Sequence, residues 1–227
     1  IMLASIIKSP HFDAVLWDFG GVITSSPFEA FAQYETQRGL PKNFIRTVNT
    51  HNPNDNAWAK MERSEIDAAE FSHLFQREAM ALGHDVAGSA VLELLDGEVR
   101  ERMVSALLTL KPHYKIACLT NNVRSGRGPA MNRSPERAER VAKVMSLFEL
   151  VVESSRVGVR KPEPRFYLSA CESLNIDPKR AIYLDDLGIN LKPAQAMGMR
   201  TIKVVDPDEA LRTLATLLGH AVVPDSA

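Results

Sequence analysis

The chain has 227 residues, of which 45% are hydrophobic and 24% are charged, and its formal net charge is −1 with a pI near 6.7. A chain of this length and composition can bury a full core, and its near-neutral charge excludes a global basic field for nucleic acid or an anionic membrane. The two cysteines fall in apolar runs without paired spacing, which argues against a disulfide framework or a zinc site.

The first apolar run, AVLWDFGG at residues 14–21, ends in Asp18 and is followed by two glycines. Its β-branched and aromatic residues predict a buried strand over residues 14–18. A carboxylate at a strand end is a candidate nucleophile or metal ligand. Such sites often carry a second acid two residues later, but this chain has Gly20 at that place.

Residues 25–110 contain several helical segments and no convincing strand. Ser64, ahead of Asp67, is a helix-start signal for the segment that follows. An all-helical block inserted after the first strand predicts a cap domain over residues 25–110. We expect its aromatic side chains to serve mostly in packing, with a substrate tunnel as the alternative: Phe28, Phe31, Tyr34, Phe44, Trp58, Phe71 and Phe75.

The remaining chain alternates strand and helix. We expect strands over residues 115–120, 181–186 and 201–206, and a further strand within residues 147–154. Helical periods cover residues 135–148, 162–175, 189–198 and 208–219. This alternation favours right-handed βαβ crossovers. It predicts an α/β core, a doubly wound parallel sheet of the Rossmann type, made of residues 1–24 and 111–227.

Ligands of open parallel sheets bind beyond the carboxyl ends of the strands, where this chain places three acids. Adjacent carboxylates such as Asp185 and Asp186 repel each other unless a cation or hydrogen-bond donors compensate. Together with Asp18 they supply hard oxygen donors of the kind that Mg²⁺ prefers. The alternative is a simple turn in which Asp186 caps the helix that begins near Gly188.

Three further polar residues accompany these acids. Lys161 precedes Pro162 and is biased towards an extended backbone ahead of a helix, where its ammonium could balance carboxylates and a phosphoryl group. An ordinary solvated surface charge is the alternative. Thr120 and Asn121 end a predicted strand and could form an anion-binding nest or merely a turn.

The segments DFGGVIT, CLTNN, VGVRKPEP and YLDDLGIN, in this order, resemble the four motifs of the haloacid dehalogenase (HAD) superfamily. The segments VGVRKPEPRFY and LDDLGINLKPAQAMGMRTIKVVD are similar to the N-terminal phosphatase domains of soluble epoxide hydrolases. The resemblance covers nearly the whole chain, strongly after residue 110 and only in helical pattern before it. It implies a HAD-like core with a helical C1-type cap.

The resemblance implies a Mg²⁺-dependent phosphomonoester phosphatase in which Asp18 attacks phosphorus and forms an aspartyl-phosphate that water cleaves. Thr120, the Asn121 backbone and Lys161 would hold phosphoryl oxygens, and Lys161 would also balance charge in catalysis. Asn190 matches a polar position that orients the site. The implied metal ligands are Asp18, the carbonyl of Gly20, Asp185 and Asp186.

Gly20 replaces an acid that, in the family pattern, also shuttles a proton to the leaving group. General acid–base help is worth about 10² to 10⁴ in rate, so we expect a weakened activity on activated or lipid-like phosphates. A proton donor from the cap is the alternative, with Glu29, Asp55 and Glu62 as candidates. A silent phospholigand-binding protein and a dehalogenase stay open, although dehalogenases of the superfamily generally need no metal.

Residues 123–137 carry four arginines, Arg124, Arg127, Arg133 and Arg137, just after the expected phosphate nest. We expect a solvated flexible loop, with electrostatic capture of a polyanionic substrate as the alternative. No apolar run approaches the roughly 18 residues of a membrane span, and the first residues lack signal-peptide features. We therefore expect a cytoplasmic protein, monomer or homodimer, that acts on a small phosphorylated substrate and binds no nucleic acid.

Overall fold

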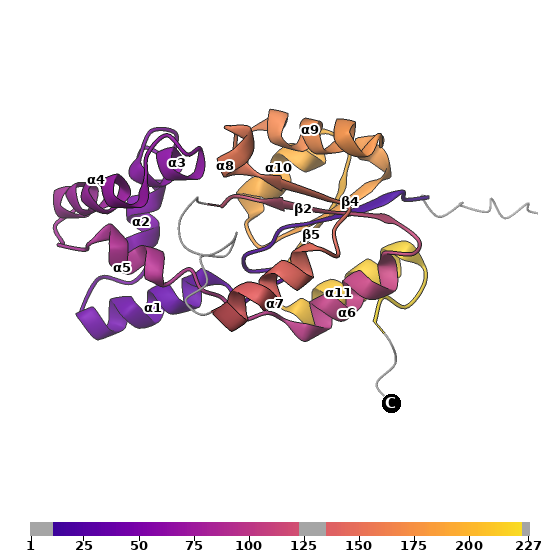
Figure 1. Ribbon diagram of the computed structural model, residues 1–227, viewed down its shortest axis with the longest axis horizontal. Coiled ribbons are helices and arrows are strands. Elements are labelled where there is room, and N and C mark those ends of the chain that lie inside the picture. Colours follow the sequence, from indigo (N-terminus) through magenta and orange to yellow (C-terminus); the bar gives the residue numbers. More distant parts are fainter. Residues whose placement is uncertain (1–10, 123–134, 224–227) are drawn as a thin grey trace, which may run out of the picture.

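The computed structural model describes residues 11–122 and 135–223, and a five-stranded parallel sheet forms its centre (Figure 1). The strand order is β3-β2-β1-β4-β5, and every neighbouring pair runs parallel. The strands are β1 (Ala14–Trp17), β2 (Lys115–Thr120), β3 (Leu150–Glu153), β4 (Ala181–Asp185) and β5 (Arg200–Lys203). The predicted doubly wound α/β fold is therefore confirmed.

Helices cover both faces of the sheet because side chains alternate along each strand. Val15 and Trp17 of β1 pack in the apolar cluster of one face, and Leu16 packs in that of the other. One face carries α6 (Glu101–Leu110), α7 (Pro135–Met145) and α11 (Pro207–Leu218). The other carries α9 (Pro164–Leu174) and α10 (Gly188–Ala196). Short helices α8 (Ser154–Val157) and η1 (Pro178–Arg180) complete the core.

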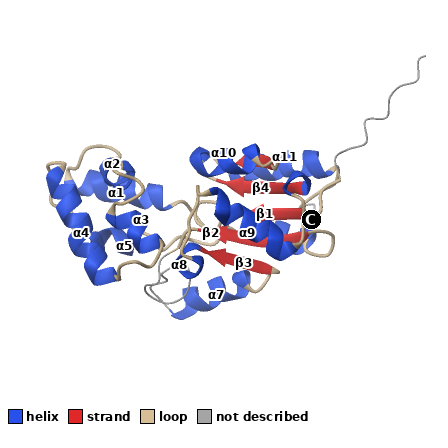
Figure 2. Cartoon of the chain, turned by 90° about the horizontal axis from the view of Figure 1, so that it is seen from above, coloured by secondary structure: helices blue, strands red, loops and turns tan. Residues whose placement is uncertain are grey.

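A helical bundle lies beside the carboxyl ends of the strands (Figure 2). It consists of α1 (Pro27–Arg38), α2 (Phe44–Thr50), α3 (Ala57–Glu62), α4 (Ala68–Ala81) and α5 (Gly88–Glu93), and we call these five helices the cap. Phe31, Phe44, Phe71 and Phe75 are buried in its own apolar cluster, which confirms packing as the main role of the aromatic residues. None of the helices in the described part combines the length and apolarity that crossing a bilayer requires.

Helix α6 packs on the sheet, although the sequence analysis includes its residues in the predicted cap domain, residues 25–110. Its Met103, Leu107 and Leu110 side chains are buried in the cluster on the sheet, and the helix contacts α11. These contacts favour a boundary ahead of α6. The division of the chain into a core and a cap domain stays a prediction.

The start of α4 also differs from expectation. The side chain of Asp67 accepts a hydrogen bond from the Glu70 N–H at 2.8 Å and so caps the helix. Ser64 has a left-handed φ of 59° outside the helix, and its hydroxyl donates to the Ser155 carbonyl at 2.9 Å. Ser64 is therefore wrong as a helix start, and it joins the cap to the core instead.

The two chain segments that connect the cap to the core lie side by side. The Ser25 N–H donates to the Glu98 carbonyl at 2.8 Å, and the Arg100 N–H donates to the Ile23 carbonyl at 2.8 Å. A Cβ at Gly97 would lie 2.8 Å from the Ser25 carbonyl oxygen. Only glycine permits this approach, so the connecting segments form a close pair.

Candidate active site

The carboxyl ends of β1 and β4 meet at the point where the strand order reverses. Asp18 follows β1, and Asp185 ends β4, which pairs directly with β1. The Asp18 N–H donates to the Leu184 carbonyl at 2.8 Å and fixes the register there. The topology thus brings these acids, 167 residues apart in the numbering, to the switch point where such sheets bind ligands.

Lys161 joins the two acids. Its Nζ lies 2.8 Å from Asp18 Oδ1 and 2.8 Å from Asp185 Oδ2. Only 1% of the lysine surface is exposed, so the alternative of a solvated surface charge is wrong. An ammonium with this burial requires paired negative charge, and the two carboxylates supply it.

Both oxygens of Asp185 accept several hydrogen bonds. Oδ1 accepts from the Leu187 N–H at 2.8 Å, and Oδ2 accepts from the Tyr183 hydroxyl and from Lys161. The side-chain amide of Asn190 donates to both oxygens at 3.1 Å. Its orienting role in the site stays a prediction. The N-cap residue of α10 is Leu187, its N–H bonds to Asp185, and no side chain caps the helix, which argues against the simple turn capped by Asp186.

Asp186 depends on the glycine turn after β1. Gly21 has a φ of 79°, and a Cβ there would lie 2.3 Å from Asp186 Oδ2. Glycine is thus required twice, for its backbone conformation and for the close approach. At Gly20, by contrast, a Cβ would meet nothing within 4 Å. The turn has room for a side chain at position 20, although the chain has none there.

Asp18, Asp185 and Asp186 each offer an oxygen within 4.8 Å of the others. Burial raises the pKa of Asp18, the Asp185 charge raises it further, and Lys161 lowers it. Burial alone would lower the pKa of Lys161, but Asp18 and Asp185 raise it above its ordinary value. Burial, followed by the Asp185 charge, raises the pKa of Asp186 to about 6.

These shifts have one physical origin. In this cluster of described residues, three carboxylates face one ammonium, which leaves an excess of negative charge in a buried site. A divalent cation with a preference for hard oxygen donors would offset that excess. The donor set therefore fits Mg²⁺, and the predicted metal role of the Gly20 carbonyl stays a prediction.

Thr120 and Asn121 end β2 beside this cluster. The Asn121 side chain accepts from the Lys161 N–H at 2.8 Å and donates to the Lys161 carbonyl at 3.0 Å. The next N–H, that of Asn122, donates to the Ser154 hydroxyl at 3.0 Å. The Asn122 N–H is therefore already bonded, so the expected nest has fewer free N–H groups than predicted. The Asn121 side chain also holds the Lys161 backbone, a contact that the sequence did not predict.

Of the four arginines in residues 123–137, Arg137 lies within the described part of the chain. Arg124, Arg127 and Arg133 lie outside the described residues. Arg137 lies in α7 and pairs with Asp96 at 2.8 Å and with Glu98. The carboxylates at the cap connection thus engage Arg137, and polyanion capture by this segment stays untested.

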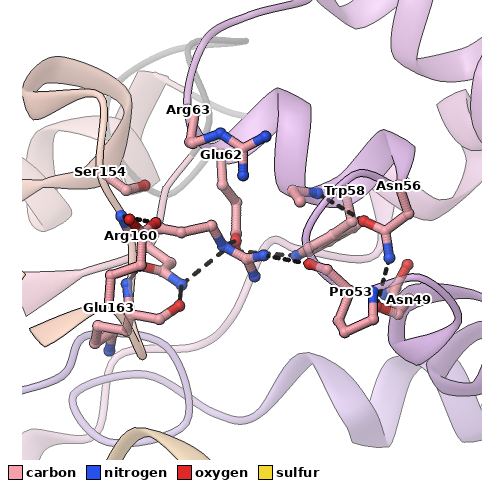
Figure 3. Close-up of polar contacts among 12 residues, drawn as sticks. Asn49, Pro53, Asn56, Trp58, Glu62, Arg63, Ser154, Arg160 and Glu163 are labelled. Atoms are coloured by element: carbon pink, nitrogen blue, oxygen red, sulfur yellow. Dashed lines mark hydrogen bonds and ion pairs between the residues drawn. The ribbon is translucent and has the colours of Figure 1, made fainter. Parts of the chain in front are cut away.

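The three cap acids differ in position. Glu29 is exposed, and Asp55 is 70% exposed and pairs with Lys60 at 3.2 Å. Glu62 is buried; its Oε2 lies 2.5 Å from Arg160 Nε and accepts from the Asn121 amide at 3.3 Å (Figure 3). Burial raises the pKa of Glu62, and Arg160 lowers it.

Two partners in this site escaped the sequence analysis. Tyr183 lies in β4 and donates to Asp185, only two positions away, but a tyrosine inside an apolar strand is indistinguishable from an ordinary core residue in the sequence. Arg160 pairs with Glu62, but in the sequence its one distinguishing feature is its place directly before Lys161. Since Glu62 lies 98 positions away in the chain, Arg160 has no local signal of this pairing.

Known proteins are similar to this chain over most of its length. The pig bifunctional epoxide hydrolase 2 is 29% identical over 221 residues, which cover 91% of this chain and 39% of that protein. The chain thus spans about two fifths of that relative's length. The sesquiterpene phosphatase astK of Aspergillus oryzae is 26% identical over 211 residues, covering 92% of this chain and 97% of its own.

A solved structure shares the fold. The HAD family enzyme BT-2542 of Bacteroides thetaiotaomicron, in complex with magnesium and inorganic phosphate, superposes with a TM-score of 0.57 at 22% identity. The superposition covers 85% of this chain and 93% of the other. The family model of the haloacid dehalogenase-like hydrolases matches residues 12–198. The chain therefore belongs to the haloacid dehalogenase-like hydrolases.

Proposed function

We propose that the protein is a Mg²⁺-dependent phosphomonoester phosphatase whose nucleophile is Asp18. One observation carries the proposal: three carboxylates and a buried lysine converge at the strand ends with an excess of negative charge. A site of this kind can take up a divalent cation together with a phosphoryl group. A relative named as a phosphatase, of nearly the same length, supports the same reaction class.

The proposed metal ligands are Asp18, Asp186 and the Gly20 carbonyl. Asp185 already accepts hydrogen bonds from four groups, so we assign it mainly to anchoring Lys161. The bound cation would offset negative charge on the phosphoryl oxygens. Lys161, held by its two carboxylates, would add the positive charge of an ammonium beside the phosphoryl group.

The Asp18 carboxylate has one oxygen engaged, because Oδ1 accepts from the Phe19 N–H at 2.7 Å and contacts Lys161. We assign the attack to Oδ2. A bond forms between this oxygen and phosphorus while the bond from phosphorus to the leaving oxygen breaks. Water then attacks the phosphorus of the aspartyl-phosphate, releases phosphate and restores the carboxylate. Thr120 and the Asn121 backbone would bind phosphoryl oxygens.

Gly20 sets the expected substrate preference. Without a side-chain acid at this position, the leaving oxygen departs without a nearby proton donor, so good leaving groups suffer least. We therefore propose aryl, acyl or otherwise activated phosphates as the preferred substrates. Lipid-like phosphates are a narrower possibility that a substrate panel would test.

The test compares an aryl phosphate with an alkyl phosphate in Mg²⁺, using the native protein, Asp18→Asn and Gly20→Asp. Loss of the nucleophile should lower turnover on the order of 10⁴-fold or more. Since Gly20 has space for a side chain, Gly20→Asp should raise the alkyl phosphate rate by about 10² to 10⁴ and the aryl rate much less.

Equal native rates on both substrates would contradict the leaving-group argument. Phosphate binding without turnover of any phosphate would favour a phospholigand-binding protein. Halide release from 2-haloacids without a metal requirement would instead identify a dehalogenase. Turnover that persists in Asp18→Asn would exclude Asp18 as the nucleophile.

A further inference from the structure

The contact between cap and core centres on one buried carboxylate, that of Glu62 at the end of α3 (Figure 3). Its Oε1 accepts from the Trp58 indole N–H at 2.9 Å within the cap. Its Oε2 faces the core, where it lies 2.5 Å from Arg160 Nε and accepts from the Asn121 amide at 3.3 Å. Only 6% of Glu62 is exposed, so this interaction is shielded from water.

The two core residues that contact Glu62 also hold Lys161. Arg160 directly precedes it in the chain. The Asn121 amide forms two hydrogen bonds to the Lys161 backbone, one to its N–H and one to its carbonyl, at 2.8 and 3.0 Å. A continuous set of contacts therefore runs from the cap carboxylate, through Asn121 and Arg160, to the lysine that bridges Asp18 and Asp185.

Arg160 has a second contact with the cap. Its NH1 group donates to the Pro53 carbonyl at 3.1 Å, in the loop ahead of α3 (Figure 3). Two positions of the cap therefore fix one guanidinium, whose fork holds its direction better than a single-point ammonium would. Movement of α3 away from the core would break both contacts and leave the Glu62 charge without its partner, which is costly in a buried setting.

We propose that Glu62 is a positioning residue, which couples docking of the cap to the placement of the Lys161 backbone. The inference rests on the proposed phosphatase function. Lys161 reaches its working position when the cap is docked, so the site binds the phosphoryl group best in that state. Glu62 is a poor choice as the proton donor that replaces an acid at Gly20, because both its oxygens already accept from donors and one faces a guanidinium.

The experiment compares Glu62→Gln with Glu65→Gln. Glu65 lies three residues further on, is 47% exposed and pairs with Arg63 at 2.6 Å, so it is a matched carboxylate outside the site. We would measure kcat and KM for a series of aryl phosphates with different leaving groups, and the Kd of inorganic phosphate in Mg²⁺ by calorimetry. Circular dichroism melting reports whether each variant is folded.

Glu62→Gln should lower kcat by on the order of 10 to 100-fold, since a small misplacement of a catalytic group has effects of this size. The loss should be equal for all leaving groups, and phosphate affinity should fall several-fold. Glu65→Gln should match the native protein. Arg160→Gln should cause a loss at least as large, since it also removes the hydrogen bond to the Pro53 carbonyl. The double variant should add little to Arg160→Gln, because the contact between Glu62 and Arg160 is already broken there.

Three results would overturn the positioning role: native kcat in Glu62→Gln, independent effects of Glu62 and Arg160, or a loss that grows with the pKa of the leaving group. The last result would make Glu62 a proton donor. If Glu62→Gln does not fold, Arg160→Lys, which keeps the charge but loses the fork, gives the same test. A native protein that neither hydrolyses aryl phosphates nor binds phosphate would instead refute the proposed function itself.

Discussion

Buried carboxylates occur in both the core and the cap, but their partners differ. Asp185 in the core contacts the Lys161 ammonium and the Tyr183 phenol, in addition to one backbone N–H, that of Leu187. Glu35 in the cap is almost as buried, yet its two oxygens accept from the backbone N–H groups of Asn43 at 2.8 Å and Ile45 at 2.9 Å, at the start of α2. Burial of a charge alone therefore does not identify a reactive site. Side-chain partners at a strand end do so, whereas backbone partners indicate a helix cap.

Removal of Lys161 should have the largest effect on stability. Lys161→Met leaves Asp18 and Asp185 buried without their cation, so the free energy of unfolding in EDTA should fall by about 3 to 5 kcal/mol. Urea denaturation measures this change, and added Mg²⁺ should recover part of it. A fall below about 1 kcal/mol would mean that water reaches the cluster and compensates the two charges.

Removal of the charge of Glu35 should have a smaller effect. In Glu35→Gln, one carboxylate oxygen becomes an NH₂ donor that faces a backbone N–H donor, so one of the two hydrogen bonds is lost. The free energy of unfolding should therefore fall by about 1 to 3 kcal/mol. Turnover per folded molecule should stay within about twofold of the native value, because the hydrogen bonds of the Glu35 carboxylate go to backbone N–H groups at the start of α2, away from the acids at the strand ends. A large loss of turnover without loss of stability would remove the distinction between the two carboxylates.

The pH dependence of stability gives a further comparison between Asp186 at the site and Glu35 in the cap. Asp186 has a pKa of about 6 in the folded protein against an ordinary value of 3.8. Between these values the folded protein binds more protons than the unfolded chain, so the stability of the metal-free protein should fall as pH rises from about 4 to about 6. Urea titrations in EDTA should show a shallower slope in Asp186→Asn than in Glu35→Gln, because Asp186 no longer contributes while Asp18, whose pKa is also raised, still does. The same slope in both variants would assign it to other groups.

The sequence allowed prediction of the core and the acids at its edge because both depend on local patterns. Strands buried on both faces appear as short apolar runs, and parallel strands bring their polar ends to one edge. Asp18, Thr120, Asp185 and Asp186 could therefore be named before the fold was known. Lys161 required the resemblance, since a lone lysine ahead of a proline has no signal of its own.

The cap could be predicted only in outline. Helix α2 has no local start signal, because N–H groups at its start bond to Glu35 from another helix rather than to a nearby capping side chain. Helix α6 is amphipathic like the cap helices. An amphipathic pattern does not distinguish a helix that packs on the sheet from one that packs in the cap. The pairing of Glu62 with Arg160 crosses 98 positions of the chain and has no local signature.

The paired connecting segments have a consequence for the modular construction of the chain. Ser25 and Glu98 are hydrogen-bonded neighbours, so the whole helical bundle enters and leaves the sheet domain at one place. A turn of two or three residues could span this junction, and an unrelated insert with closely spaced ends could be grafted there without altering strand order. The helical bundle can thus be exchanged as one unit, provided that the new insert replaces the contacts of Glu62 with Arg160 and Asn121.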